Sequence, residues 1–467
     1  MVETIGWTIP QWLEAQRASS SEEGLARIIA HVATFSKDDV AIITIASEDF
    51  LKTQWKQLQA IPNAKSLPLY GVPFAPKDNI DVAGLPTTVA CPAFKYEPNK
   101  DAVIIQILKQ AAGAIPICKT NLDQFATGLV GTRSPYGAVP SAFNPEYCSG
   151  GSSSGSSNVV ARGLAPFSLG TDTAGSGRVP AMHNNLIGLK PSRGAFSATG
   201  VVPACRELDC VSVLAQNLPD AKTVFDLAAK YDPTDSYSRP LPDTLLPSFG
   251  PKPKLAIPDV PQWFDDTENA PLWEKTVEEF RAAGVELVPS DFTPMYKLGA
   301  CLYEGPWVAE RYTVVRKLIE SDPDAMDPTV RTIIQLANKF SAADQFDWEH
   351  LRRDLVREIE IKFADFDGFL VPTAPLSPKI KDVQADPIKL NSKQGTYTNF
   401  VNFADMAALA IPAGFRQDGM PFGVTIIGRK HTDYALLDIA QKVLSGKERL
   451  LGNLGKTSVV KVTDVVF

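Results

Sequence analysis

The chain of 467 residues has little histidine, no paired cysteine motif and no long apolar run. Its four histidines do not stand at zinc-ligand spacing from a cysteine or an acidic residue, so a metal site is not expected. Six scattered cysteines in so large a chain indicate free thiols in a reducing compartment, which favours the cytoplasm. No apolar stretch approaches the roughly 20 residues of a membrane-spanning helix, and the first residues lack the pattern of a secretory signal.

The chain also lacks the excess of basic residues that binding to nucleic acid or anionic lipid requires. Its formal net charge is −7, so neither of these partners is expected. Hydrophobic residues make up 44% and charged residues 21%, which is the ordinary composition of a folded protein.

Several segments combine a helical pattern with a short apolar run. Asp101 is the expected N-cap of a helix over 102–112, which Gly113 closes before a strand over 114–118. Further helices are predicted over 271–283, 352–366 and 434–444, and further strands over 285–288, 369–372 and 423–428. This alternation predicts an α/β fold with a central mixed β-sheet covered by helices on both faces.

Proline is concentrated between residues 233 and 271, where nine prolines occur. This composition predicts an extended crossover between two lobes of one domain rather than a free hinge. The chain is therefore expected to form one domain over 1–467, with the crossover inside it.

Two segments rich in serine and glycine stand out, GGSSSGS at 150–156 and GTDTAGSGR at 170–178. The composition of the first is also typical of a flexible linker, but the sequence continues from it without a domain boundary. The second could be a tight turn after a strand. Alternatively, its glycines let successive amide N–H groups point into one cavity around Ser176, which would stabilise an oxyanion.

A third segment, VPFAPKDN at 72–79, places Lys77 in apolar surroundings. A serine nucleophile needs a base that accepts its proton. A lysine can be that base if burial lowers its pKa enough to leave it neutral. The three segments together predict covalent acyl transfer by serine and lysine, with no histidine required.

Four segments, in this order and spacing, resemble the amidase signature family: GVPFAPKDN, CKTNLDQFATG, GGSSSGS and GTDTAGSGRVPA. The resemblance implies the family's α/β fold and amide hydrolysis by a Ser–cis-Ser–Lys triad without a cofactor. The matching positions are Lys77 for the lysine, Ser152 for the bridging cis-serine, Ser176 for the nucleophile, Thr173, Ala174, Gly175 and Ser176 for the oxyanion hole, and Gly128 for a backbone contact with the substrate.

The residues around these positions are expected to be structural. Asp172 and Arg178 flank the nucleophile and are predicted to form a buried supporting pair, and Asp123 is predicted to support the loops. The serines other than Ser152 and Ser176 are also expected to have structural roles.

Other segments narrow the resemblance to the allophanate hydrolase subfamily. They are GTDTAGSGRVPA, ELDCVSV at 207–213 and LYEGPWVAERY at 302–312. The resemblance implies that the terminal amide nitrogen of allophanate (N-carboxyurea) is released as ammonia in urea breakdown. This small substrate carries a carboxylate, which the planar fork of an arginine can bind through two hydrogen bonds. Tyr303 and Arg311 match the substrate-binding residues of the subfamily, and the alternative for Arg311 is a surface ion pair with Glu304 or Glu310.

Other functions stay open at this point. They are hydrolysis of another small amide, the role of an amidotransferase A-like subunit, and a non-catalytic scaffold. The expected partners are the small-molecule substrate, a second copy of the chain in a homodimer and, in a longer protein, a C-terminal domain and urea carboxylase. The chain has neither a biotin-attachment AMKM tetrapeptide nor an ATP-type glycine loop. It is therefore expected to be the amidase domain alone, without the smaller C-terminal domain.

Overall fold

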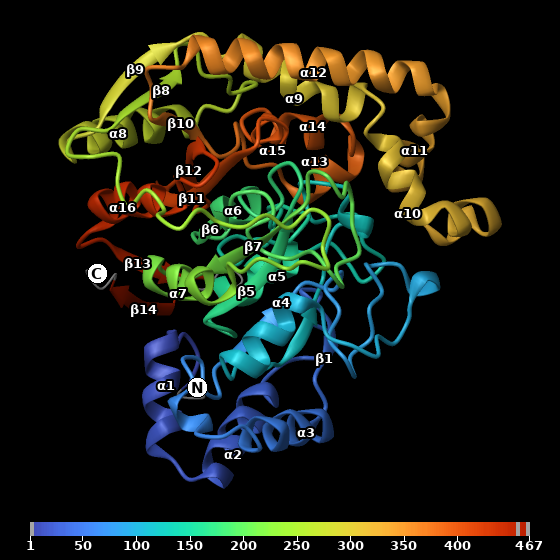
Figure 1. Cartoon of the computed structure of the whole chain (residues 1–467), viewed down its shortest axis with the longest axis vertical. Helices are drawn as coiled ribbons and strands as arrows, with labels where there is room; N and C mark the ends of the chain where they lie inside the picture. Colours follow the sequence, from blue (N-terminus) through green and yellow to red (C-terminus); the bar gives the residue numbers. More distant parts are fainter. Residues whose placement is uncertain (1–3, 454–457, 464–467) are drawn as a thin grey trace.

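A ten-stranded mixed sheet runs through the molecule, whose computed structural model describes residues 4–453 and 458–463 (Figure 1). The strand order is β3 (Ile115–Pro116), β2 (Pro73–Pro76), β5 (Phe167–Asp172), β7 (Cys210–Ala215), β6 (Ile187–Lys190), β11 (Met406–Phe415), β12 (Pro421–Arg429), β10 (Gly368–Pro372), β8 (Lys254–Pro258) and β9 (Glu286–Ser290). Pairing is parallel toward both ends of the sheet and antiparallel from β5 to β10.

Two smaller sheets and the helices complete the fold. The small sheets pair β1 (Ile42–Ile45) with β4 (Cys118–Thr120) and β13 (Glu448–Leu451) with β14 (Ser458–Thr463). The first half of the chain contributes α1 (Ile9–Ala18), α2 (Ser21–Val32), α3 (Glu48–Gln59), α4 (Val103–Gln106), α5 (Ser154–Ala161), α6 (Val179–His183) and α7 (Leu218–Ala228). The second half contributes α8 (Asn269–Ala282), α9 (Thr293–Glu304), α10 (Val308–Ser321), α11 (Pro328–Gln335), α12 (Ala342–Lys362), α13 (Ile380–Ala385), α14 (Lys389–Gln394), α15 (Asn399–Phe403) and α16 (Asp433–Leu444).

Successive side chains of the central strands enter two cores on opposite faces of the sheet, because side chains alternate along a strand. In β10, Leu370 packs into the larger core with Phe280 of α8 and Leu436 of α16. Its neighbours Phe369 and Val371 enter a second core, to which α9, α12 and α15 contribute. The prediction of a mixed sheet covered by helices on both faces is therefore confirmed.

The predicted helix over 102–112 forms, but its predicted cap does not. It consists of α4 followed by a π-helical turn, Ile107–Ala111, and Gly113 closes it with a positive φ. Asp101 does not cap this helix. Its carboxylate instead accepts from the amide of Ala83 and forms an ion pair with Lys109 at 2.6 Å.

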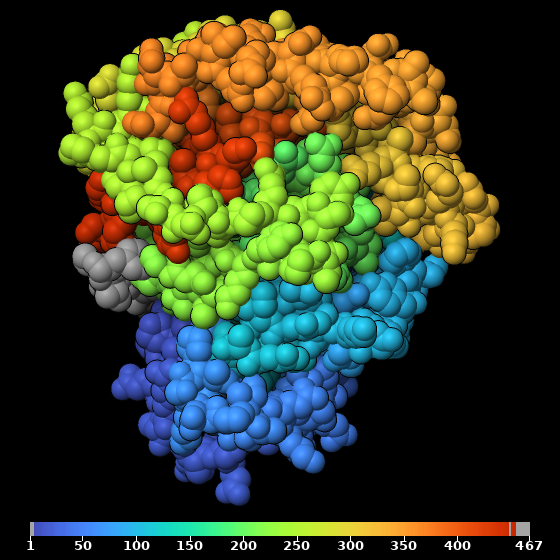
Figure 2. Space-filling model, in the orientation of Figure 1, coloured from blue at the N-terminus to red at the C-terminus, as the bar shows by residue number. Residues whose placement is uncertain are grey.

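The other predicted helices and strands lie close to their expected places. The largest difference is α12, which begins at Ala342 rather than at 352, because Ser341 and Asp344 form a capping box there. The proline-rich segment 233–271 contains strand β8 and the start of α8. Between α7 and β8 the chain crosses the front of the molecule, yellow-green in Figure 2.

Two of the segments singled out in the sequence, those that carry Lys77 and Ser176, follow neighbouring strands of the sheet. β2 and β5 are parallel neighbours in the register Pro76↔Leu169. Lys77 follows β2 directly, and Thr173 follows β5 directly. Because the carboxyl ends of parallel strands lie on the same side, the lysine and the loop after β5 emerge together. No helix in the described part of the chain has the length and apolar character to span a membrane.

Candidate active site

Lys77 is fully buried and is surrounded by hydroxyl groups. Its Nζ lies 2.8 Å from Ser152 Oγ, 3.0 Å from Ser153 Oγ and 2.8 Å from Thr171 Oγ1. No carboxylate of the described residues forms an ion pair with it. The lysine is therefore held by neutral partners rather than by a counterion.

Burial lowers the pKa of Lys77 to about 7, because removal from water disfavours the ammonium form. Asp123, Asp209 and Asp172 oppose this shift at longer range, and the charge of Arg311 adds to it. Near neutral pH the lysine thus has a substantial neutral fraction that can accept a proton.

A neutral amine has two N–H groups and one lone pair, so one of the three hydroxyls must donate to Lys77 Nζ. Ser153 is already committed, because its Oγ donates to the carbonyl of Thr171 at 3.1 Å. Ser152 and Thr171 remain as donors to the lysine.

Asp123 supports the serine loop at 150–156 through its backbone amide, and its carboxylate fixes the neighbouring loop at 130–133. This carboxylate accepts from the amides of Val130, Gly131 and Arg133 at 2.9–3.2 Å. A Cβ on Gly151 would collide with the same carboxylate. The Gly151–Ser152 peptide bond is cis, and the Ser152 carbonyl accepts from the Asp123 amide at 3.2 Å. The role of Asp123 in supporting the loops is thus confirmed.

Ser176 lies beside this loop, in the turn between β5 and α6. Its carbonyl accepts from the amide of Ser153 at 3.3 Å, which ties the two serine segments together. Its Oγ, however, donates to the carbonyl of Gly128 at 3.4 Å rather than to Ser152. The structure thus contains the Lys77–Ser152 contact, while Ser176 is turned toward Gly128.

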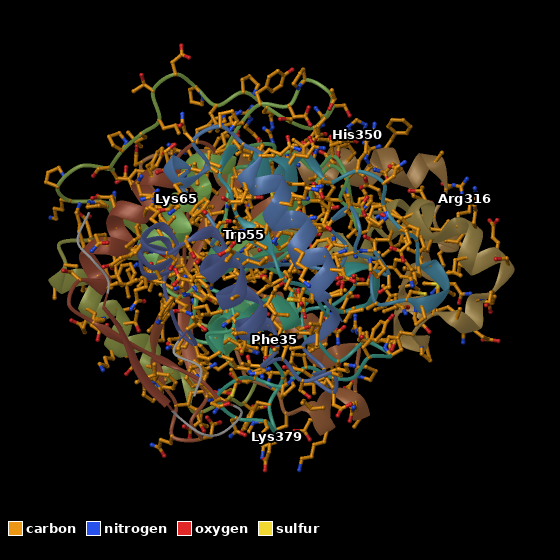
Figure 3. All side chains as sticks on the ribbon, turned by 90° about the horizontal axis from the view of Figure 1, so that it is seen from below. Phe35, Trp55, Lys65, Arg316, His350 and Lys379 are labelled. Carbon is orange, nitrogen blue, oxygen red and sulfur yellow. The ribbon has the colours of Figure 1, made fainter. Side chains whose placement is uncertain are left out.

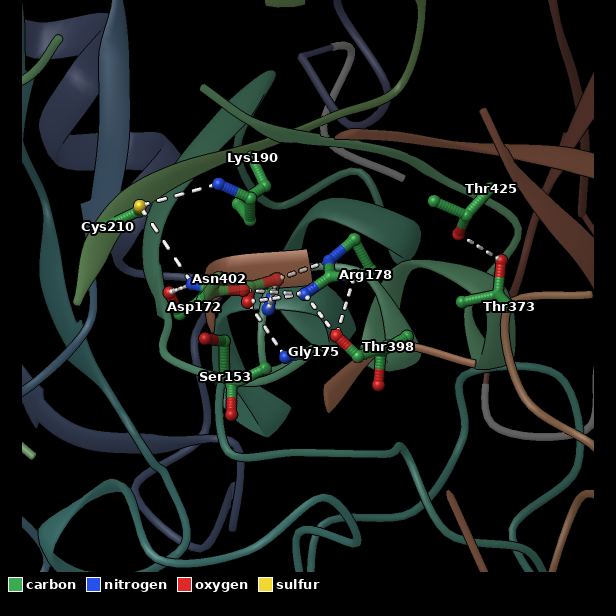
Figure 4. Close-up of polar contacts among 12 residues, drawn as sticks. Ser153, Asp172, Gly175, Arg178, Lys190, Cys210, Thr373, Thr398, Asn402 and Thr425 are labelled. Atoms are coloured by element: carbon green, nitrogen blue, oxygen red, sulfur yellow. Dashed lines mark hydrogen bonds and ion pairs between the residues drawn. The ribbon is translucent and has the colours of Figure 1, made fainter. Parts of the chain in front are cut away.

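Asp172 and Arg178 hold the ends of the Ser176 turn (Figure 4). Both side chains are fully buried and form a bidentate pair at 2.8 and 2.9 Å. Burial alone would raise the pKa of Asp172, but the Arg178 guanidinium holds it below its ordinary value. The predicted buried supporting pair is confirmed.

The same network reaches the C-terminal part of the chain. Arg178 also donates to the Thr398 carbonyl at 3.2 Å and to Asn402 Oδ1 at 3.1 Å. Asn402 Nδ2 in turn donates to the backbone carbonyl of Asp172 at 2.8 Å. Both ends of the Ser176 turn are therefore clamped by α15 and the residue before it, as Figure 4 shows.

The four amides predicted for the oxyanion hole fall into two groups. The amide of Gly175 already donates to Asp172 Oδ1 at 2.7 Å. Those of Thr173, Ala174 and Ser176 have no hydrogen-bond acceptor among the described residues. Gly175 therefore differs from the other three predicted donors, which are the ones left to bind an oxyanion.

Arg311, on α10, is buried without a carboxylate partner. Its side chain packs against the ring of Tyr303, with Cζ 5.9 Å from the ring centroid. Nη1 donates to the Ala126 carbonyl at 3.2 Å and to Thr127 Oγ1 at 3.0 Å. No acidic residue in the described part of the chain lies within ion-pair distance, so the alternative of a surface ion pair is wrong.

The chain around Gly128 connects Arg311 with Ser176. Arg311 holds Ala126 and Thr127, and the next residue, Gly128, accepts the hydrogen bond of Ser176. A buried guanidinium with unused donors thus contacts the two residues directly before Gly128, whose carbonyl accepts from Ser176.

Sequence reasoning missed three residues of this site: Ser153, Thr171 and Thr127. Ser153 and Thr171 contact Lys77 directly, which corrects the expectation that all serines besides Ser152 and Ser176 are structural. The period of two along β5 could have placed Thr171 on the same face as Leu169 and Thr173, but nothing in a run of three serines separates Ser153 from Ser154.

The cysteines and acidic residues suggest no further chemistry. All six cysteines are buried and outside disulfides. Within residues 4–453 and 458–463, no group of three or more metal-ligating side chains lies close enough to hold an ion.

Comparison with known proteins places these features in one family. The family model described as Amidase matches residues 23–437. The urea amidolyase of Lachancea kluyveri is 51% identical over 446 residues, which cover 94% of this chain and 24% of that protein. The chain thus spans about a quarter of the length of this curated relative.

Two further proteins are similar over most of the chain. The solved Kluyveromyces lactis allophanate hydrolase is 47% identical with a TM-score of 0.95, covering 98% of this chain and 76% of that one. The A subunit of the glutamyl-tRNA(Gln) amidotransferase of Symbiobacterium thermophilum is 32% identical, covering 87% of this chain and 90% of that protein.

The buried Asp172–Arg178 pair predicts a stability effect. Arg178→Met leaves the Asp172 carboxylate buried without its cation, and we expect it to lower the free energy of unfolding by about 3–5 kcal/mol. Urea denaturation would measure the loss. The exposed Arg281→Met, which removes a surface pair with Glu278, should cost less than about 1 kcal/mol. Equal stability of Arg178→Met and the wild type would contradict the prediction.

Proposed function

The chain belongs to the amidase family, and we propose that it hydrolyses the terminal amide of allophanate and releases ammonia. The observation that carries the substrate assignment is Arg311, a buried guanidinium without a carboxylate partner near the Ser176 turn. The similarity to the Kluyveromyces lactis allophanate hydrolase supports the same substrate, and the similarity to the Lachancea kluyveri urea amidolyase supports a role in urea breakdown. Release of ammonia from allophanate by the isolated chain tests the proposal.

Acylation begins at Ser176. Its Oγ turns from Gly128 toward Ser152 and attacks the terminal amide carbonyl of the substrate. The Ser176 proton passes to Ser152 Oγ as the Ser152 proton passes to neutral Lys77. The new carbon–oxygen bond converts the carbonyl into a tetrahedral oxyanion. The 2.8 Å contact between Lys77 and Ser152 supports this order of transfer.

Collapse of the tetrahedral intermediate releases ammonia. The carbon–nitrogen bond breaks, and the leaving nitrogen takes a proton from Ser152, which Lys77 replaces. Water then attacks the ester of Ser176 and gives its proton to the same relay, and Ser176 recovers its own proton as the ester breaks. One water is consumed, and ammonia and N-carboxycarbamate leave.

The oxyanion is stabilised by the unpaired amides of Thr173, Ala174 and Ser176. The turn that carries these amides is held by Asp172 and Arg178. Donors fixed in this way need no reorganisation when charge develops on the carbonyl oxygen.

Arg311 and Tyr303 bind the other end of the substrate. Arg311 Nη1 donates to the Ala126 carbonyl and to the Thr127 hydroxyl. The other guanidinium donors remain available to a carboxylate. Tyr303 packs against the guanidinium. Gly128, between the two ends, contributes its backbone to the pocket.

A second candidate is the role of an amidotransferase A-like subunit. The similarity to the Symbiobacterium thermophilum protein supports it. Such a subunit would release ammonia from glutamine, so comparing glutamine with allophanate as substrates separates the two.

The names and lengths of the relatives support a proposal about the partners of this chain. We propose that the chain is the amidase domain over 1–467 of a urea-degrading system in which a C-terminal domain and urea carboxylase complete the process. The homodimer and the cytoplasmic location remain predictions.

We expect Ser176→Ala to abolish ammonia release from allophanate, because it removes the attacking oxygen. A coupled ammonia assay with freshly prepared allophanate would measure it, with Ser66→Ala, an exposed serine whose Oγ donates to the Asn63 carbonyl, as the control. The proposal fails if the wild-type chain releases ammonia from glutamine but none from allophanate.

The proposed role of Lys77 as the base predicts how the activity depends on pH. Only neutral Lys77 accepts the proton, so kcat/KM should rise with pH and level off above an apparent pKa near 7. The rate at which a fluorophosphonate labels Ser176 should rise over the same range, which separates ionisation of the lysine from that of the substrate. Lys77→Met should lose both activities, and a flat wild-type profile across neutral pH would refute the role of the lysine.

Arg311→Ala should weaken allophanate turnover selectively. Loss of a buried cation facing an anion costs about 2–5 kcal/mol, which corresponds to a factor of about 30 to several thousand in kcat/KM. The kcat/KM of the same variant for biuret, the neutral amide analogue of allophanate, should fall much less. Arg316, exposed on the same helix at the rim of the molecule (Figure 3), provides the control Arg316→Ala. Equal losses on the two substrates would contradict carboxylate binding by Arg311.

A further inference from the structure

Asp209 faces the start of the Ser176 turn from the neighbouring strand. β5 and β7 pair antiparallel, and the last pair of their ladder is Asp172↔Cys210. Continuing this register by one residue sets Thr173 opposite Asp209. The sheet itself therefore brings the first residue of the turn against a carboxylate that the proposed mechanism does not use.

The contact between the two residues is a short hydrogen bond. Thr173 Oγ1 donates to Asp209 Oδ1 at 2.5 Å. The same carboxylate accepts from the amides of Ala204 and Cys205 at 2.8 and 3.2 Å. Asp209 thus receives three donors, which fix it to its own loop at 204–209 and make that loop an anchor for Thr173.

The position of Thr173 connects this anchor with the reaction. The Thr173 amide is one of the three unpaired donors, and Ala174 carries the next. Asp172 fixes the turn at Gly175 and Gly177, on the far side of these amides. On the near side, the Asp209 contact fixes the turn together with the hydrogen bond from Asn402 Nδ2 to the Asp172 carbonyl.

Asp209 also contributes charge to the site. Its negative charge favours the ammonium form of Lys77, together with Asp123 and Asp172, whereas Arg311 disfavours that form. The charged or titratable groups that act on Asp209 or are acted on by it are Lys77, Cys205, Arg311 and, on α10, Glu310. Burial raises the pKa of Asp209 above its ordinary value, and the hydrogen bonds from Thr173, Ala204 and Cys205 and the charge of Arg311 only partly oppose this shift.

We propose that Asp209 is a positioning residue that aligns the oxyanion donors through the hydroxyl of Thr173 and maintains the charge balance around Lys77. This inference rests on the proposed function. It assigns Asp209 two separable effects, one transmitted by a hydrogen bond and one by charge. Thr173→Val removes only the first, because valine has nearly the same shape without the hydroxyl. Asp209→Asn removes the charge and disturbs the hydrogen bonds.

The test compares kcat and KM of the single variants Thr173→Val, Thr173→Ser and Asp209→Asn and of the double variant Thr173→Val/Asp209→Asn. We expect Thr173→Val and Asp209→Asn each to lower kcat on the order of 10²-fold, with KM for allophanate nearly unchanged. Thr173→Ser should restore most of kcat, since it keeps the hydroxyl. The double variant should lose little more than either single variant, because both break one contact.

The pH profile separates the charge from the hydrogen bond. Asp209→Asn should move the rising limb of kcat/KM to lower pH, because one of the charges that favour the ammonium form of Lys77 is gone. Thr173→Val should leave the limb in place. Glu207→Gln is the matched control, a nearby carboxylate on the same loop that pairs with Arg193 and Arg352 instead of Thr173. It should change neither kcat nor the limb.

Three results would overturn the inference: wild-type kcat in Thr173→Val, additive losses in the double variant, or an unshifted limb in Asp209→Asn. If Asp209→Asn does not fold, the Thr173→Val and Thr173→Ser comparison still decides the positioning effect. Fluorophosphonate labelling of Ser176 is a readout that does not depend on allophanate, because its phosphoryl oxygen uses the same donors. Slower labelling of Thr173→Val would support the inference even if the wild-type chain proved inactive on allophanate.

Discussion

The burial of Lys77 among hydroxyl groups is the constraint on which the rest of the site depends. A lysine removed from water favours its neutral form only if no carboxylate lies next to it, since an adjacent anion would restore the ammonium. Ser152, Ser153 and Thr171 satisfy its hydrogen bonds without adding charge. The lysine can therefore be solvated by the protein and remain basic near neutral pH.

The nearby carboxylates are compatible with this constraint because each is engaged elsewhere. Asp123 is bound by three backbone amides, and Asp172 by Arg178. These interactions hold the negative charges at a distance from Lys77 at which they temper its pKa without reversing the shift. The same interactions fix the loop at 130–133, which lies against Gly151, and the Ser176 turn, so loop geometry and the pKa of the lysine have a common structural origin.

Sequence reasoning reached the fold and the main segments of the site because they depend on local patterns. Helix–strand alternation predicted the mixed sheet. The family resemblance singled out Lys77, Ser152 and Ser176, and the structure places Lys77 against Ser152 and the Ser176 turn beside that serine loop. Sequence reasoning failed where the hydrogen-bond partner of a residue depends on how segments pack in three dimensions. Ser153 cannot be distinguished from its serine neighbours in the sequence, although it contacts Lys77. Asp101 is a residue type that commonly caps helices, but it pairs with Lys109. The hydrogen bond from the Gly175 amide to Asp172 depends on how the turn closes.

The clamp on the Ser176 turn has a consequence for biosynthesis. Arg178 belongs to the first half of the chain, but two of its acceptors, Thr398 and Asn402, are translated more than two hundred residues later. Until they leave the ribosome, the Asp172–Arg178 pair lacks those contacts and α15 cannot close over it. The Ser176 turn therefore acquires its last contacts only after residue 402 has been translated.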